Sequence, residues 1–146
     1  MPSAASDLPD INVWVALSEA AHAHHSRASH YWNSERADRV VFCGTTILGM
    51  LRILTLPSAM GGNPFKTDEA FLKYREFARL PETGFIADSE NICAPFGSWT
   101  SERFFTAKLW TDAWIAAVAM ENGCRVVSFD ADFARFPGLN FLHLKP

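Results

Sequence analysis

Short apolar stretches, separated from one another by segments with helical pattern, constrain the fold of this chain more than any other feature. Residues 7–11, 40–43, 125–129 and 140–144 have the character of short buried strands, and 85–87 is a shorter candidate. Strands that alternate with helices favour a parallel sheet covered on both faces. The sequence therefore predicts an α/β fold around a central parallel sheet of four to five short strands.

The helical segments fall between these strands. We expect a helix turn at 13–17 and helices at 22–34, 47–54, 67–79 and 111–122. Thr45 or Thr46, Thr67 and Thr111 are the expected N-caps, because a threonine hydroxyl can accept from the free N–H groups at a helix start. Gly123 suits the end of the last helix. Residues 60–64 are predicted as a loop, 88–107 as irregular with one short helix, and 130–136 as a turn or short helix.

Composition limits the class of protein. The 146 residues are 49% hydrophobic and 20% charged, which is typical of one globular domain spanning 1–146. Residues 1–6 lack the pattern of a secretory signal, and no stretch is long and apolar enough to span a membrane. The three cysteines are scattered, which favours buried thiols in a reducing compartment. We therefore expect a cytoplasmic protein without a membrane association.

Aspartates follow the predicted strands at the places where the fold would gather them. Asp10 ends the first strand, Asp130 and Asp132 follow the strand at 125–129, and Asp112 stands at the start of an apolar helix. In open parallel sheets the ligand site lies at the carboxyl ends of the strands. Each aspartate also has a structural interpretation, as a helix cap, a charge favoured by the helix dipole or a turn residue. Their common placement favours a functional cluster.

A cluster of carboxylates is a candidate metal site. Like charges in proximity repel unless a cation lies between them, and oxygen ligands suit Mg²⁺ or Mn²⁺. Such an ion can activate water and neutralise charge on a phosphodiester. The formal net charge of −3 counts mildly against a nucleic-acid ligand, but the carboxylates of a metal site themselves lower the total. The histidines in HAHHSRASH (22–30) are interpreted as solvated or packed on a helix rather than as metal ligands.

Four segments resemble the PIN domain of the VapC toxins: LPDINVWVAL (8–17), HAHHSRASHYW (22–32), TDAWIAAVA (111–119) and VVSFDADFARFPGL (126–139). The resemblance implies an α/β/α sandwich and cleavage of RNA with Mg²⁺ or Mn²⁺. It also implies a cognate antitoxin and a homodimer. By position, Asp10, Asp112 and Asp130 resemble the family's catalytic, metal-binding residues, and Asp132 resembles an accessory metal-binding carboxylate. We expect Asn12, Thr46 and Ser128 to support the site by orienting ligands or water.

The sequence departs from the family pattern at Gly49, where a glutamate is usual. Asp88, Glu90 or water could replace that ligand. The departure leaves open a degenerate PIN-like module that binds RNA or a protein without cleaving, and divalent-metal binding separates the two hypotheses. A third hypothesis, a phosphoaspartate enzyme or receiver using Asp10, is disfavoured because no lysine is well placed late in the chain.

Overall fold

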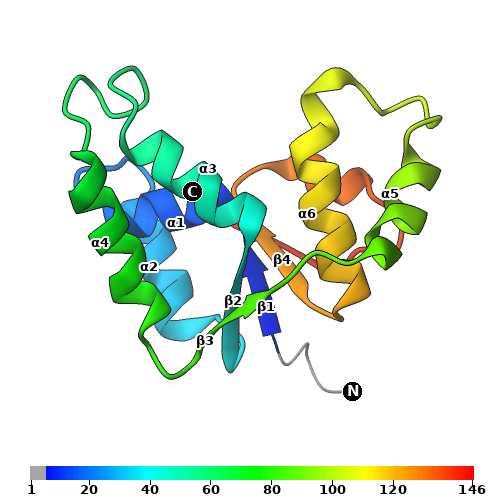
Figure 1. The fold of residues 1–146 in the computed structure, drawn as a ribbon, viewed down its shortest axis with the longest axis horizontal. Coiled ribbons are helices and arrows are strands. Elements are labelled where there is room, and N and C mark those ends of the chain that lie inside the picture. The colour runs from blue at the N-terminus through cyan, green and yellow to red at the C-terminus, as the bar shows by residue number, and fades with distance from the viewer. Residues whose placement is uncertain (1–5) are drawn as a thin grey trace.

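The computed structural model describes residues 6–146, so most of the N-terminal stretch interpreted above lies outside the described residues. One parallel sheet runs through the molecule, in the strand order β3-β2-β1-β4-β5 (Figure 1). The strands are β1 (Ser6–Pro9), β2 (Arg39–Cys43), β3 (Thr83–Ile86), β4 (Arg125–Ser128) and β5 (Phe141–His143). The predicted parallel sheet is confirmed.

Helices cover both faces of this sheet. Figure 1 shows α1 to α4 on one side and α5 and α6 on the other. Their bounds are α1 (Ile11–Ser18), α2 (His25–Ser34), α3 (Gly44–Leu54), α4 (Thr67–Ala78), α5 (Cys93–Trp99) and α6 (Trp110–Glu121). Short 3-10 helices lie at η1 (Glu90–Ile92), η2 (Ala107–Leu109) and η3 (Ala131–Arg135). The architecture is an α/β/α sandwich, and none of the described helices is long and apolar enough to cross a membrane.

The two layers follow from the period of two in a strand. Val40 and Phe42 of β2 pack into one core with Trp14, whose ring stacks on Phe42 with the centroids 3.9 Å apart. The alternate residues Val41 and Cys43 pack into the other core, against the apolar side chains of α6. Successive strand side chains point to opposite faces, so a continuous apolar run such as VVFC can line two cores at once.

Several predicted helix caps and boundaries differ from the structure, although the helix predicted from residue 67 does begin at Thr67. The strand predicted at 7–11 ends at Pro9, and α1 begins at Ile11 because the Asp10 carboxylate accepts from the Ile11 amide at 2.7 Å. The helix predicted from residue 22 begins at His25, after a turn. The cap of α4 is Lys66 rather than Thr67, and that of α6 is Leu109 rather than Thr111. Thr67 is the first residue of α4 and Thr111 the second residue of α6, so both are already helical and neither is the cap.

The cap predicted for α3 was wrong, whereas the glycine predicted to end α6 was right. The cap of α3 is Cys43, and Thr46 lies inside the helix, where its hydroxyl accepts from the Cys43 amide at 3.0 Å. Thr46 therefore serves the helix start from the third position rather than as the cap. Gly123 has a φ of 64° and ends α6 as predicted. Cys93 was expected to be buried but is exposed at the start of α5.

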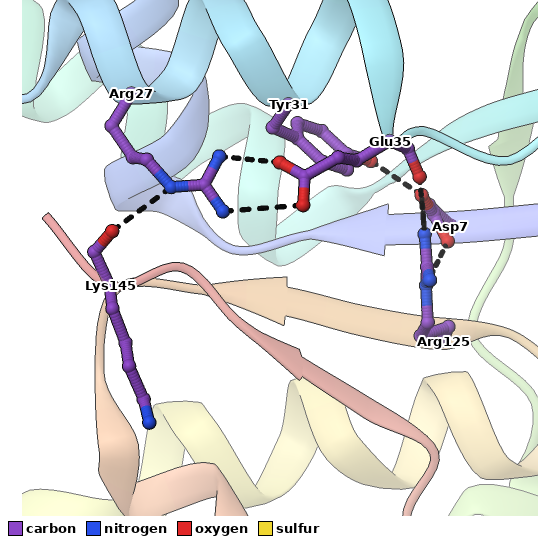
Figure 2. Close-up of polar contacts among 6 residues, drawn as sticks. All are labelled: Asp7, Arg27, Tyr31, Glu35, Arg125 and Lys145. Carbon is purple, nitrogen blue, oxygen red and sulfur yellow. Dashed lines mark hydrogen bonds and ion pairs between the residues drawn. The ribbon is translucent and has the colours of Figure 1, made fainter.

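A buried ionic group joins β1, α2 and β4 at the amino end of the sheet (Figure 2). The Asp7 carboxylate is fully buried and accepts from the Tyr31 hydroxyl at 2.6 Å and the Ala37 amide at 2.9 Å. Arg125 donates to both carboxylate oxygens, at 2.8 and 2.9 Å, and to the Glu35 carbonyl oxygen at 3.0 Å. Hydrogen bonding to Asp7 raises the pKa of Arg125. These contacts fix the register of β1 against β4.

Candidate acidic active site

The strand order reverses between β1 and β4. From β1 the chain adds β2 and β3 on one side, and then returns through α6 to place β4 on the other side of β1. The β1–β4 pairing extends to Asp10, whose amide donates to the Val127 carbonyl at 2.8 Å. A reversal of this kind leaves a crevice at the carboxyl ends of the two strands. Asp10 and Asp130 follow these two strand ends, so the topology itself brings them together.

Ser128 connects the two strand ends. Its hydroxyl donates to the Asp10 carboxylate at 2.7 Å and accepts from the Asp130 amide at 2.9 Å. The Asn12 side-chain Nδ2 donates to the same hydroxyl at 3.2 Å, and the Asn12 side-chain Oδ1 accepts from the Phe129 backbone amide at 3.4 Å. Burial raises the pKa of Asp10, against the hydrogen bonds from Ser128 and Ile11, and the charge of Asp130 adds to the rise. The Asp10 side chain is therefore held in one orientation.

Asp112 faces the same group of carboxylates from the first turn of α6. Burial, the largest cause, and the charges of Asp10, Asp130 and Asp132 together raise the pKa of Asp112 to about 7. The three other sequence-predicted aspartates therefore lie close enough to Asp112 for their charges to act on its pKa. Asp10, Asp112 and Asp130 form no ion pair with a lysine or arginine within residues 6–146.

Asp130 and Asp132 also stabilise the turn in which they lie. The Asp130 carboxylate accepts from the Asp132 amide at 2.9 Å and so caps η3. Asp132 is 44% exposed and pairs with Arg135 at 3.5 Å. Arg135 is close enough to partly neutralise the charge of Asp132. In this respect Asp132 differs from Asp10, Asp112 and Asp130, which have no lysine or arginine partner among the described residues. The contrast is consistent with an accessory position for Asp132.

Thr46 and Asp88 lie beside the carboxyl end of β2. The Thr46 hydroxyl is buried and bonded to Cys43, on the β2 side of β1. Burial raises the pKa of the Cys43 thiol and the charge of exposed Asp88 adds to the rise, which places Asp88 near the end of β2. Neither Asp88 nor Glu90 is among the charges that act on the pKa of Asp112.

The aspartate oxygens are the donor type that a hard cation prefers, but the described side chains are not arranged around a cation position. Within the described part of the chain, no three His, Cys, Asp or Glu side chains are arranged to hold a metal ion as they stand. The donors are all carboxylate oxygens, and the charge of Asp130 raises the pKa of both Asp10 and Asp112. Repelling carboxylates separate when no cation lies between them. Oxygen donors of this kind suit Mg²⁺ or Mn²⁺.

Gly49 lies against α1 rather than facing open space. A Cβ atom at position 49 would lie 2.1 Å from Cδ1 and 2.6 Å from Cγ1 of Ile11, so the Ile11 side chain fills the space beside the glycine. The sequence departure at Gly49 is thus matched by an apolar residue next to Asp10. Glycine at this position permits the close approach of α1 and α3.

His22 was not among the predicted site residues, yet it lies beside Asp10. A hollow of about 260 Å³ is lined by Asp10, Asn12 and His22 together with apolar side chains of α1 and α3. No sequence pattern indicates this proximity, because it depends on the path of the turn between α1 and α2. That path is set by packing: the His24 ring stacks on Phe129, with the centroids 4.6 Å apart.

Known proteins resemble this chain in both sequence and fold. Residues 8–139 match the PIN domain model. Ribonuclease VapC41 of Mycobacterium tuberculosis is 32% identical over 140 residues, covering 90% of this chain and 94% of that protein. Ribonuclease VapC33 of the same organism is 28% identical over 138 residues, covering 92% and 94%. Among solved structures, M. tuberculosis VapC20, described as a Sarcin-Ricin loop cleaving toxin, superposes with a TM-score of 0.71 at 18% identity, covering 95% of this chain and 98% of that one. VapBC2 from Rickettsia felis, bound to a DNA fragment from its promoter, superposes with a TM-score of 0.67 at 12% identity, covering 96% of this chain and 99% of that one.

Proposed function

The chain belongs to the PIN domain family and, within it, to the VapC ribonucleases, and on this premise we propose that it is a metal-dependent endoribonuclease that acts as the toxin of a type II toxin–antitoxin system. The observation that carries the proposal is the convergence of Asp10, Asp112 and Asp130 at the crevice between β1 and β4. Three sequence regions supply these carboxylates, and none of the three has a protein cation as a partner among the described residues.

The roles follow from the contacts. Asp10, Asp112 and Asp130 would hold the cation, with Asp132 as an accessory ligand. When bound, Mg²⁺ or Mn²⁺ supplies charge neutralisation for the phosphodiester and lowers the pKa of water. Ser128 would orient the Asp10 carboxylate through its hydrogen bond, and Asn12 would orient the Ser128 hydroxyl. Thr46 keeps a supporting role through the start of α3, which packs against α1 beside Asp10.

The proposal is tested by RNA cleavage across a metal titration. The wild-type chain should cut RNA in Mg²⁺ at millimolar order, because few protein carboxylates give weak coordination, and more strongly in Mn²⁺. Asp112→Ala should lose cleavage by a factor of at least about 100, because even removal of a residue that only orients a metal ligand costs about 10–100-fold. Asp38→Asn is the matched control, because this exposed carboxylate precedes β2 at the opposite edge of the sheet.

Two outcomes would contradict the proposal in different ways. Equal cleavage in excess chelator would rule out the metal mechanism. RNA binding without cleavage under any divalent metal would favour the degenerate module, which the apolar contact at Gly49 also supports. Calorimetry with Mn²⁺ separates these outcomes, since the degenerate module should bind no metal at Asp112.

The partners belong to the same proposal. RNA is the substrate, an antitoxin encoded beside this chain is the inhibitor, and a homodimer is the active form. The Haemophilus influenzae VapBC-1 structure, at a TM-score of 0.65 and 16% identity, supports the fold on which this rests. Because RNA and an antitoxin are the proposed partners, we expect the chain to act as a single domain in the cytoplasm. Co-purification with the product of a short neighbouring gene and light scattering of the free chain test these partners.

A further inference from the structure

A second and larger hollow opens beside the acidic crevice. It has a volume of about 830 Å³ and lies between the 19–24 turn and the 59–63 loop. His22 lines both this hollow and the smaller one that contains Asp10, so the two meet at the His22 side chain. Binding sites for small ligands commonly have volumes of about 300–1,000 Å³. We call the larger space the His22 hollow.

Both walls of the His22 hollow are built by local hydrogen bonds. The Glu19 carboxylate accepts from the Ala21 amide at 2.9 Å, and His22 Nδ1 accepts from the His24 amide at 3.0 Å. On the other side, the Gly62 amide donates to the Pro57 carbonyl at 2.9 Å, and Gly61 and Gly62 take positive φ values of 60° and 84° in this turn. The walls are therefore arranged before any ligand arrives, which lowers the cost of binding.

The side chains in the His22 hollow suit an uncharged, planar, polar group. The lining includes the Asn63 amide, the His22 imidazole and the Met60 side chain, and it contains no lysine or arginine. Because Nδ1 of His22 accepts a hydrogen bond, a neutral ring carries its proton on Nε2, as a donor. Burial lowers the pKa of His22, with His24 and His25 adding to the effect, which favours the neutral ring. The Glu19 carboxylate disfavours a phosphate in this space.

Resting on the proposed ribonuclease function, we propose that the His22 hollow binds one unpaired nucleobase of the RNA beside the bond that is cut, and so makes cleavage base-selective. Unpaired bases are recognised through hydrogen bonds to their edges and contacts to their faces. Amide and carboxylate side chains read base edges, and Met60 supplies an apolar surface. The shared His22 wall places that base next to Asp10, while the backbone phosphate lies at the acidic crevice.

The first test uses the full chain and needs no cleavage. Each of the four ribonucleoside 5′-monophosphates is titrated in chelator while the Met60 methyl group is followed by NMR. We expect a saturable shift with one base preferred, weakened about tenfold in Asn63→Ala, the order of one lost base contact. Asn140→Ala is the matched control, because Asn140 is exposed just before β5. The Met120 methyl on α6 should not respond. A Met60 methyl that none of the four nucleotides shifts would overturn the assignment.

The second test is cleavage of a randomised RNA pool with sequencing of the new ends. Wild type should prefer one base beside the cut, and Met60→Ala and Asn63→Ala should flatten that preference about tenfold. If wild type cuts RNA but Asn63→Ala changes neither the base preference nor the NMR shift, the base site is refuted and the ribonuclease function stands. If the Met60 methyl shifts while wild type cuts no RNA, the nucleotide site stands and the ribonuclease function fails. Variants that change only antitoxin binding would also refute the base site.

Discussion

Replacing Arg125 with methionine should destabilise the protein more than any other single change at an ion pair described above. The substitution removes three hydrogen bonds, two of them to the fully buried Asp7 carboxylate, and the only charged partner that the described contacts give to that carboxylate. Breaking a buried pair by removing one partner costs about 3–5 kcal/mol, because the remaining charge stays buried. Since a domain's total stability is about 5–15 kcal/mol, this is a large share of it.

The surrounding residues give a graded series. Tyr31→Phe removes one hydrogen bond to the same carboxylate and should cost about 1.5–3 kcal/mol. The double variant Asp7→Asn with Arg125→Met should lose less than the sum of the single changes, since it leaves no buried charge. Lys73→Met is the control: its pair with Glu76 spans 3.2 Å on exposed α4 and should contribute about 0.5 kcal/mol or less.

The assay is urea unfolding in chelator, followed by tryptophan fluorescence and analysed for the free energy of unfolding in water. Thermal melts should show a fall of roughly 10 °C for Arg125→Met, at about 2–4 °C per kcal/mol for a chain of this size. A loss for Arg125→Met no larger than that for Lys73→Met would refute the reasoning. It would mean that water reaches the Asp7 carboxylate once Arg125 is gone.

The other predictions concern the acidic crevice. Asp10→Asn should be neutral or stabilising in metal-free melts, because it removes a buried like charge, yet inactive on RNA; a clear loss of stability would favour a purely capping role. For Asp112, the folded pKa of about 7 lies above the unfolded value of 3.8, so metal-free stability should fall as pH rises from about 4 to 7, by at most about 4 kcal/mol and less after solvent screening. Asp112→Asn should abolish that slope in urea midpoints measured across this pH range, and an unchanged slope would contradict the assignment. Gly49→Glu should cost about 1–3 kcal/mol because its Cβ overlaps Ile11. Ile11→Ala with Gly49→Glu should recover stability and tighten Mn²⁺ binding by calorimetry, whereas unchanged affinity would show that position 49 does not reach the cation.

The sequence by itself determined the layer structure and the placement of the aspartates. Apolar runs such as VVFC and the alanine-rich segment at 111–119 carry their pattern within a few residues, and that pattern selects strand or helix. Once the sheet is parallel, the carboxyl ends of its strands lie at one edge. Asp10 and Asp130 were therefore predictable as neighbours in the fold, although 120 positions separate them in the sequence.

Only the tertiary structure decided which side chains around the aspartates make contact. Ser128 meets Asp10 across 118 residues because β4 pairs with β1, and the local pattern of either strand does not specify its neighbour. The same holds for Ile11 beside Gly49, and for His22, which lies where the turn after α1 packs. Local sequence sets the conformation of each segment through short-range sterics and hydrogen bonds. The contacts among segments depend on the strand order and on packing, which no single window of the chain contains.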